Sequence, residues 1–274
     1  MPTCYIVGAG DFTPRGFAPV PGDLVLAADG GYRALYSLGY TPDLLLGDFD
    51  SLGDLPLPPD LPVLRFPARK DDTDTGLALR HGLDRGFRDF ALYGCAGGRV
   101  DHLLANLQSM ARVSRLGAAI RLAAPEYDAW ALTGPAPDAP ASHISASHAS
   151  APHASAPSTP APDAPAPHIS ASHASAPSTS APDASAPDAS GPAPHAPDGP
   201  AATLTLPDRP GGTLVSVFCH GDRAEGVTLT GLSYPLDGAA LAGDFPLGVS
   251  NRRLEGRPAT VSVRRGTLLI FQGV

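Results

Sequence analysis

The amino-acid sequence predicts an α/β protein: an N-terminal open, mostly parallel six-stranded sheet with helices on both faces, followed by a small C-terminal antiparallel β-sandwich domain. Over the first 130 residues, short apolar runs that end in Gly or Asp alternate with stretches of helical periodicity. Continuous apolar strands alternating with helices are typical of a parallel sheet covered on both faces. After Ala201 the chain changes to alternating strands with Gly turns, which indicates an antiparallel β domain.

The predicted elements follow in chain order. The six apolar runs are Cys4–Gly8, Leu24–Ala28, Leu44–Gly47, Pro62–Phe66, Phe90–Tyr93 and Ala119–Ala123. Helical periodicity covers Tyr32–Leu38, Thr75–Arg85 and Val100–Leu116. In the last of these, Leu103, Leu104, Leu107 and Met110 recur at helical spacing, which predicts one apolar face. The expected C-terminal strands include Thr213–Phe218, Gly226–Leu229, Ala259–Val263 and Thr267–Phe271.

Residues 135–200 differ in composition from the rest of the chain. These 66 residues hold 16 of the 32 prolines, six of the nine histidines and five Asp, with no Lys, Arg or aromatic residue. The ten residues His143–Pro152 recur identically at His168–Pro177. Such a segment buries too little apolar surface to offset the entropy of ordering it, which predicts disorder with polyproline-II character. Its regularly spaced histidines suit loose metal binding, but a duplicated low-complexity insertion is the simpler interpretation.

The insertion divides the chain into three predicted parts: 1–134, 135–200 and 201–274. We expect it to replace the tip of a hairpin between strands at Ala129–Thr133 and Ala202–Leu206. The 208 residues outside it are enough to build proper cores in two small domains.

Composition and charge exclude several classes of protein. The 274 residues carry a net charge of −8 without a basic block, which argues against nucleic-acid binding. The longest apolar runs are far shorter than the roughly 20 residues that a membrane span needs. The N-terminus lacks the basic start and the cleavage site of a signal peptide, so we expect a cytoplasmic protein. Three widely spaced cysteines form neither a disulfide framework nor a zinc pattern.

Acidic residues gather where the predicted strands end, at the edge where open parallel sheets bind ligands. They are Asp29 after the second strand, Asp48 and Asp50 after the third, Asp71, Asp72 and Asp74 after the fourth, and Asp101 after the fifth. At least five carboxylates would meet there, beside Lys70 and Arg99. Clustered like charges raise each other's pKa and are costly without a cation. Such surroundings suit Mg²⁺, which commonly bridges one or two carboxylates to substrate phosphates.

Some of these residues also have a purely structural interpretation. Asp72 or Thr73 could cap the helix that begins near Asp74, and taken alone this is the better reading. Asp29, followed by two glycines, could belong to an ordinary turn.

Other residues favour chemistry more clearly. The pair Asp48 and Asp50 flanks one residue at a strand end, so both carboxylates project from one face of an extended segment. Gly97–Gly98 before a helix is typical of a phosphate cradle formed by backbone N–H groups. Lys70 is the only lysine among 19 basic residues, and a lysine is a compact charge suited to a phosphate oxygen. His102 fits packing or helix capping as well as acid–base chemistry.

Together these residues resemble the thiamine pyrophosphokinase (thiamine diphosphokinase) family. The resemblance rests on Ala28–Gly31, Gly47–Ser51, Lys70–Asp74, Gly97–His102 with Asn106, Glu225–Leu229, Gly231–Leu236 and Gly248–Asn251. The order and approximate spacing hold over nearly all of the 208 residues outside the insertion. The resemblance implies a catalytic α/β domain that binds ATP and Mg²⁺, a β-sandwich that binds thiamine, and a homodimer with sites at the subunit interface.

The reaction that the resemblance implies is thiamine + ATP → thiamine diphosphate + AMP. Asp48, Asp50 and Asp74 are assigned to catalysis and to Mg²⁺, with Lys70 as a further catalytic residue. The expected ATP- and phosphate-binding residues are Asp29, Asp71, Thr73, Gly97, Gly98, Arg99, Asp101 and His102. Ser250 and Asn251 match the motif associated with the thiamine pocket.

The chain departs from the family pattern at two places. Arg252–Arg253 follow Asn251 where relatives often carry an acidic residue. Some relatives stack thiamine on an aromatic ring near the last strand, where this chain has Ile270, and the adjacent Phe271 points to the opposite face.

Three other functions remain compatible with the sequence. They are a pyrophosphokinase for another heterocyclic alcohol such as a hydroxymethylpterin, a non-catalytic nucleotide-binding scaffold, and a phosphohydrolase. Ser250–Asn251 argues against the first, and five mutually repelling carboxylates argue against a scaffold.

Overall fold

The computed structural model describes residues 1–49, 52–66, 72–135, 143–145 and 200–274, with the backbone alone for 143–145. They belong to one compact unit, Met1–Ser150 with Ala196–Val274. A second unit, Ala151–His195, lies outside the described residues, and with it most of the predicted low-complexity insertion.

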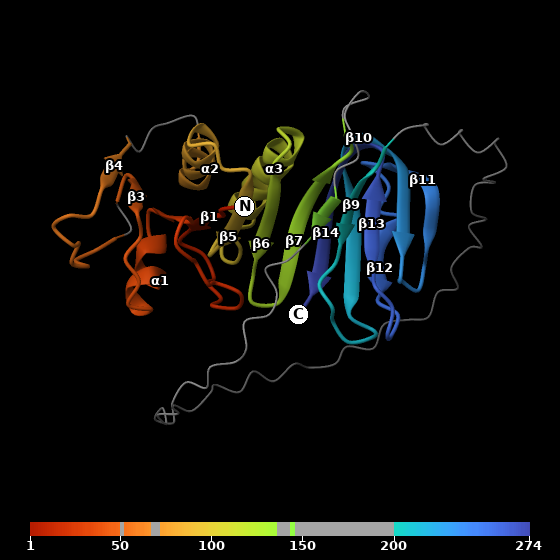
Figure 1. Ribbon diagram of the computed structural model, residues 1–274, viewed down its shortest axis with the longest axis horizontal. Coiled ribbons are helices and arrows are strands. Elements are labelled where there is room, and N and C mark those ends of the chain that lie inside the picture. Colours follow the sequence, from red (N-terminus) through yellow and green to blue (C-terminus); the bar gives the residue numbers. More distant parts are fainter. Residues whose placement is uncertain (50–51, 67–71, 136–142, 146–199) are drawn as a thin grey trace, which may run out of the picture. The chain divides into compact units, whose positions relative to one another are not determined.

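The six predicted apolar runs all form strands, and these six pair in parallel. They are β1 (Cys4–Val7), β2 (Leu24–Ala28), β3 (Leu44–Gly47), β4 (Val63–Arg65), β5 (Asp89–Tyr93) and β6 (Ala119–Ala123). Their order in the sheet is β4-β3-β2-β1-β5-β6 (Figure 1). The sheet does not end there, because β7 (Tyr127–Thr133) pairs antiparallel with β6 and then with β14 (Arg265–Gly273). The result is a mixed sheet, of which the predicted parallel sheet is the first part.

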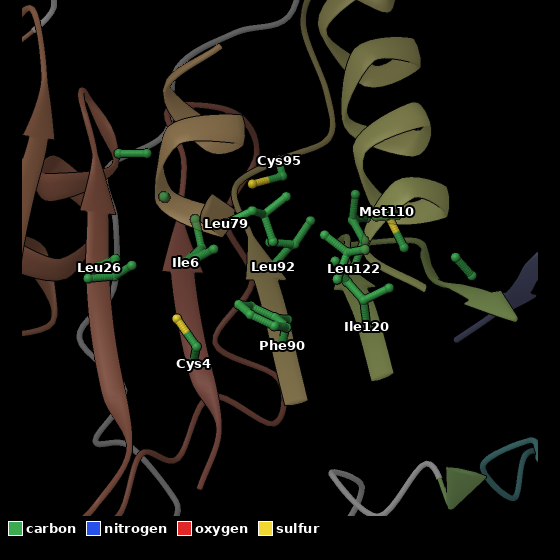
Figure 2. Packing of buried hydrophobic residues seen from close by; sticks show 14 of the residues in the cluster. Cys4, Ile6, Leu26, Leu79, Phe90, Leu92, Cys95, Met110, Ile120 and Leu122 are labelled. Atoms are coloured by element: carbon green, nitrogen blue, oxygen red, sulfur yellow. The ribbon is translucent and has the colours of Figure 1, made fainter. Parts of the chain in front are cut away.

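The helices cover both faces of the parallel strands, as predicted. They are α1 (Gly31–Ser37), α2 (Asp74–Asp84) and α3 (Val100–Arg115). Figure 2 shows Ile6 and Leu92, from β1 and β5, packed with Leu79 of α2 and Met110 of α3. On the other face, α1 places Leu35 in a second core formed with alternate residues of the same strands. No helix in the described part of the chain is long and apolar enough to cross a membrane.

The C-terminal part consists of strands. They are β9 (Ala202–Thr205), β10 (Leu214–Thr230), β11 (Leu236–Ala242), β12 (Gly248–Arg252), β13 (Thr260–Val263) and β14. The two strands predicted at 213–218 and 226–229 are one long strand, β10. Its first half pairs with β12 and β14, and its second half with β11 and β13. Register shifts in this pairing let one strand serve two sets of neighbours.

The predicted hairpin between 129–133 and 202–206 is wrong. β7 pairs with β6 and β14, whereas β9 pairs with β13 and with the short β8 (His143–Ser145). The reason lies in the burial of β7: Ala129 and Ala131 join the core under α3, while Trp130 and Leu132 join the C-terminal core. A strand buried on both faces occupies the middle of a sheet and needs a partner on each edge. The composition of the insertion did not indicate β8.

A buried ionic network joins distant parts of the chain around Asp128, whose side chain is only 1% exposed. Arg15 Nη1 lies 2.8 Å from Asp128 Oδ2, and Arg121 Nη2 lies 2.8 Å from Oδ1. Arg209 Nη2 approaches Oδ2 at 3.4 Å. The N-terminal loop, β6, β7 and the loop before β10 therefore meet at one carboxylate.

Candidate functional site

The ends of β2 and β3 bring Asp29 beside the turn that carries Asp48. The Asp29 amide donates a 2.7 Å hydrogen bond to the carbonyl of Leu46, which continues the pairing of the two strands. Asp29 Oδ1 accepts a 3.0 Å hydrogen bond from the Phe49 amide. A Cβ added to Gly47 would lie 3.0 Å from the Cβ of Asp29, so only glycine lets the two loops approach this closely. Asp29 therefore fixes the backbone of the turn that contains Asp48.

The same two loops hold unusual backbone conformations. Asp29 has φ +46° and Phe49 has φ +69°, in the left-handed region that non-glycine residues rarely adopt. Arg65, the last residue of β4, supports the turn: its guanidinium lies 4.6 Å from the centre of the Phe49 ring, and Nη1 donates to the Asp48 carbonyl at 3.3 Å. Strained residues of this kind concentrate at ligand-binding sites. The ordinary-turn interpretation of Asp29 is confirmed as well, because the Tyr32 amide donates to the Asp29 carbonyl at 3.2 Å.

The loops after β1 and β5 form a second part of the site. The Gly10 amide donates to the Gly94 carbonyl, and the Asp11 amide to the Ala96 carbonyl, both at 2.7 Å. The carboxylate of Asp11 lies against Gly97, where an added Cβ would be 2.0 Å from Asp11 Oδ2. Asp11 was missed in the sequence analysis because the glycines around it are too common to single it out. Asp11 could have been identified from its position, because it is a carboxylate that follows the first parallel strand.

Gly97–Gly98 lead into the N-terminus of α3, as predicted for a phosphate cradle. Both glycines have positive φ, +83° and +62°, and no side chain caps the first turn of the helix. Arg99 Nε donates to Asp101 Oδ1 at 3.1 Å, and this exposed pair lowers the pKa of Asp101, mainly through the hydrogen bond. His102 is also exposed. The N-cap residue Arg99 thus leaves the first backbone N–H groups of α3 open to an anion, with the His102 amide already bonded to Asp101.

Two side chains fasten the loop after β5 to the helices. Asn106, 7% exposed, donates from Nδ2 to the Cys95 carbonyl at 2.8 Å. The buried hydroxyl of Thr75 lies 3.9 Å from the sulfur of Cys95. The first turn of α2 and the second turn of α3 therefore contact the same loop, which places Asp74, the first residue of α2, at this end of the sheet.

Thr73 confirms the capping interpretation: it is the N-cap of α2, and Oγ1 accepts a 3.0 Å hydrogen bond from the Gly76 amide. Asp72 does not cap the helix but pairs with Arg80 and accepts a bond from the Thr73 amide.

Replacing Thr73 by Ala is expected to lower the free energy of unfolding by about 1 kcal/mol, because one amide of the first turn loses its acceptor. Urea unfolding followed by circular dichroism measures this. Thr73→Ser, which keeps the hydroxyl, is the matched control. An alanine variant as stable as the serine variant would contradict the capping role.

Ser250 and Asn251 lie on β12, which pairs with β10 and with no strand of the parallel set. Asn251 is 3% exposed, and its carboxamide holds the backbone of Tyr234: Oδ1 accepts from the Tyr234 amide at 2.9 Å, and Nδ2 donates to the Tyr234 carbonyl at 2.7 Å. The Tyr234 side chain is 72% exposed. Ser250 has φ +59°, and its amide donates to Ser216 Oγ. Asn251 thus presents an exposed aromatic ring that the sequence analysis did not assign.

The last strand offers no such ring. Ile270 is completely buried, and Phe271 packs against Tyr127 and Phe218. Arg253, one of the two arginines that depart from the family pattern, is buried and donates to the Pro207 carbonyl at 2.7 Å.

Asp50, Lys70 and Asp71 lie outside the described residues. Among the residues that are described, no group of three His, Cys, Asp or Glu side chains could hold a metal ion. Asp48, partly exposed at the end of β3, offers the carboxylate oxygens that Mg²⁺ prefers, so the donor chemistry fits this cation.

Comparisons with known proteins match two stretches of the chain. The model of the thiamin pyrophosphokinase catalytic domain matches residues 21–122, and that of the thiamin pyrophosphokinase vitamin B1 binding domain matches residues 202–268. The thiamine pyrophosphokinase of Bacillus subtilis (strain 168) is 33% identical over 103 residues. The aligned stretch covers 36% of this chain and 48% of that protein, so the match spans about half of the relative's length.

Solved structures agree in fold. The crystal structure of thiamine pyrophosphokinase from Bacillus subtilis superimposes with a TM-score of 0.66 at 20% identity, covering 99% of each chain. Thiamin pyrophosphokinase from Candida albicans gives a TM-score of 0.61 at 10% identity, covering 100% of this chain and 89% of the other. With both domain models matched in order along one sequence, the chain belongs to the thiamin pyrophosphokinase family.

Proposed function

We propose that the chain is a thiamine diphosphokinase, which transfers the pyrophosphoryl group of ATP to the hydroxyl of thiamine and yields thiamine diphosphate and AMP. The observation that supports this most strongly is the presence of a catalytic domain and a vitamin B1 binding domain in one chain. The hydroxymethylpterin alternative has no counterpart to the second match.

The transfer is a substitution at the β-phosphorus of ATP. The thiamine hydroxyl oxygen forms a bond to this phosphorus, the bond to the oxygen that bridges the α- and β-phosphates breaks, and AMP leaves with that oxygen. The hydroxyl proton passes to a carboxylate, for which Asp48, Asp50 and Asp74 are the candidates. Little covalent help is needed, so positioning and neutralisation of charge carry the catalysis. Mg²⁺ held by these carboxylates would neutralise phosphate charge when bound.

The remaining residues of the α/β part position and neutralise the phosphates. The Gly97–Gly98 backbone and the uncapped turn of α3 receive phosphate oxygens. Arg99 exchanges its partner Asp101 for phosphate, and Lys70 supplies a second positive charge. Asp29 acts through the turn that it holds, since its carboxylate is bonded to the Phe49 amide. Asp71, Thr73, Asp101 and His102 complete the ATP site as orienting residues.

Thiamine binds at β12. The exposed ring of Tyr234, a residue whose backbone is held by the carboxamide of Asn251, supplies an aromatic face, and Ser250 supplies a hydroxyl for the aminopyrimidine. The large apolar side chains exposed nearby in the sequence, Phe245, Leu247 and Val249, support a homodimer, because a surface of this kind is usually covered by a partner. A cytoplasmic location completes the proposal.

The test is incubation of the purified chain with Mg²⁺-ATP, with and without thiamine, followed by chromatography of the nucleotides. AMP that appears only with thiamine, in equal amount to thiamine diphosphate, is the expected result. ADP would show a simple γ-phosphoryl kinase and would exclude the mechanism. Release of phosphate without thiamine would point to a hydrolase. Chelation of the metal with EDTA is expected to stop turnover.

A further inference from the structure

A groove runs between α2 and α3, beside the loop that carries Asp72 and Thr73 into α2. Two adjoining hollows form it and share Asp72, Ser109 and Arg112. The larger has a volume of about 610 Å³ and extends to Arg115 at the end of α3. The smaller is lined on its apolar side by residues such as Leu83 of α2. The groove thus combines room for a ligand with both polar and apolar walls.

The charge of the groove is opposite to that of the chain. Among the described residues that line it, Arg80, Arg112 and Arg115 face a single carboxylate, Asp72, a balance of about +2 on a chain whose net charge is −8. Asp72 is already paired with Arg80. Arg112 and Arg115 form no ion pair with any described residue and are exposed. An anion that enters the groove therefore meets two guanidinium groups that no carboxylate of the described residues neutralises.

Stabilisation of the helix explains only part of this arrangement. Arg112 and Arg115 lie in the last turn of α3, where positive charge is favourable to the helix dipole. Arg80 lies inside α2, well before its last residue, Asp84, and has no such reason to face the same groove. Gln108 and Ser109 add neutral hydrogen-bonding groups between the arginines.

We infer that the arginines of this groove bind a phosphate- or pyrophosphate-bearing anion, at a place that adjoins the ATP site proposed at the strand ends and, among the described residues, shares only Thr73 with it. Guanidinium groups bind phosphate through paired N–H donors and need no cation to do so. The acidic strand ends repel a free anion unless a metal is present. Binding in the groove is therefore independent of Mg²⁺, which separates the two sites experimentally.

Asp72 links the groove to the start of α2. One of its oxygens pairs with Arg80, and the other accepts a 2.9 Å hydrogen bond from the amide of Thr73, the N-cap residue. An anion that binds Arg80 competes with this carboxylate. Binding of an anion in the groove would therefore alter the hydrogen bond at the N-cap and shift Asp74, the next residue. In this way the groove can regulate the reaction.

Isothermal titration calorimetry of the full chain with inorganic pyrophosphate, in EDTA and without nucleotide or thiamine, tests the inference. Binding to the wild type is expected. Arg112→Gln with Arg115→Gln should weaken it by about tenfold or more, because two charge-assisted bonds are lost. Asp72→Asn should strengthen it by about threefold, because Arg80 loses its competing partner. A structural defect would weaken binding in every variant, so it cannot explain affinity changes of opposite sign at two positions of one groove.

The matched control is Arg85→Gln with Arg257→Gln, which removes the same charge from exposed positions that line neither hollow. This control should bind like the wild type. If both double variants bind pyrophosphate equally weakly, the effect is one of net charge and not of the groove. If the wild type gives no heat of binding, the site is excluded. Melting curves verify folding, and Arg115→Gln alone gives the same test where the double variant does not fold. Failure here leaves the proposed reaction untouched, because the titration contains no metal, nucleotide or thiamine.

Discussion

Replacing Asp48 by Asn is expected to lower kcat for thiamine diphosphate formation by a factor on the order of 100 to 1,000, a typical loss when one electrostatic group of an active site is removed. Asn has nearly the same shape as Asp but carries no charge, so the carboxylate proposed to bind Mg²⁺ is lost while the turn after β3 keeps its backbone. The fold is expected to remain, because Asp29 bonds the Phe49 amide and Arg65 bonds the Asp48 carbonyl, and the substitution keeps both of these backbone groups. Steady-state kinetics at saturating ATP and thiamine measures the effect.

The control for Asp48→Asn is Asp60→Asn, an equal loss of charge at an exposed position before β4. Its kcat should match that of the wild type. A kcat for Asp48→Asn within about threefold of the wild type would remove this residue from the catalytic assignment. A large fall in melting temperature would show instead that the carboxylate supports the fold.

Replacing Asp128 by Ala is expected to lower the free energy of unfolding by about 3–5 kcal/mol, since the buried guanidinium of Arg121 would lose its partner carboxylate. Arg15 and Arg209 would remain nearby and repel it. The loss should appear in the whole unit, because the network joins the N-terminal loop, β6, β7 and the loop before β10. Urea unfolding measures this loss, provided that the free energy of unfolding depends on urea concentration with the same slope in both proteins.

An exposed ion pair provides the comparison. Asp208 pairs with the buried Arg253 at 3.0 Å, but its own side chain is fully exposed. Asp208→Ala should therefore cost much less than Asp128→Ala, because water replaces the lost carboxylate more readily at the surface. If the two variants unfold at the same urea concentration, burial does not govern the Asp128 network.

Local periodicity was sufficient to predict the elements of the α/β part. Each apolar run became a strand, and the stretches at 32–38, 75–85 and 100–116 became α1, α2 and α3 with shifts of a residue or so at their ends. These features depend on contacts within a few residues, which the sequence displays directly. The same holds for Asp29, Asp48 and Gly97–Gly98: the carboxyl ends of parallel strands share one edge, so a position at a strand end already indicates a position in space.

Pairing between distant segments could not be predicted in this way. Nothing in Tyr127–Thr133 indicates that its partner is the last strand rather than the segment after the insertion, since an apolar strand can pair with many others. The same limit applies to the side chains that hold the site. The contact of Asp11 with Gly97 joins residues 86 positions apart, and the bond between Asn251 and Tyr234 spans 17.

The sequence by itself therefore determined the elements of the α/β part, the acidic residues at the strand ends and the resemblance to the family. The tertiary structure decided which strands β7 and β10 join, which residues position the reactive ones, and where arginines gather between α2 and α3. The physical reason is range. Helix and strand formation and the chemistry of strand ends are set locally, whereas sheet order and side-chain networks depend on which distant surfaces exclude water together.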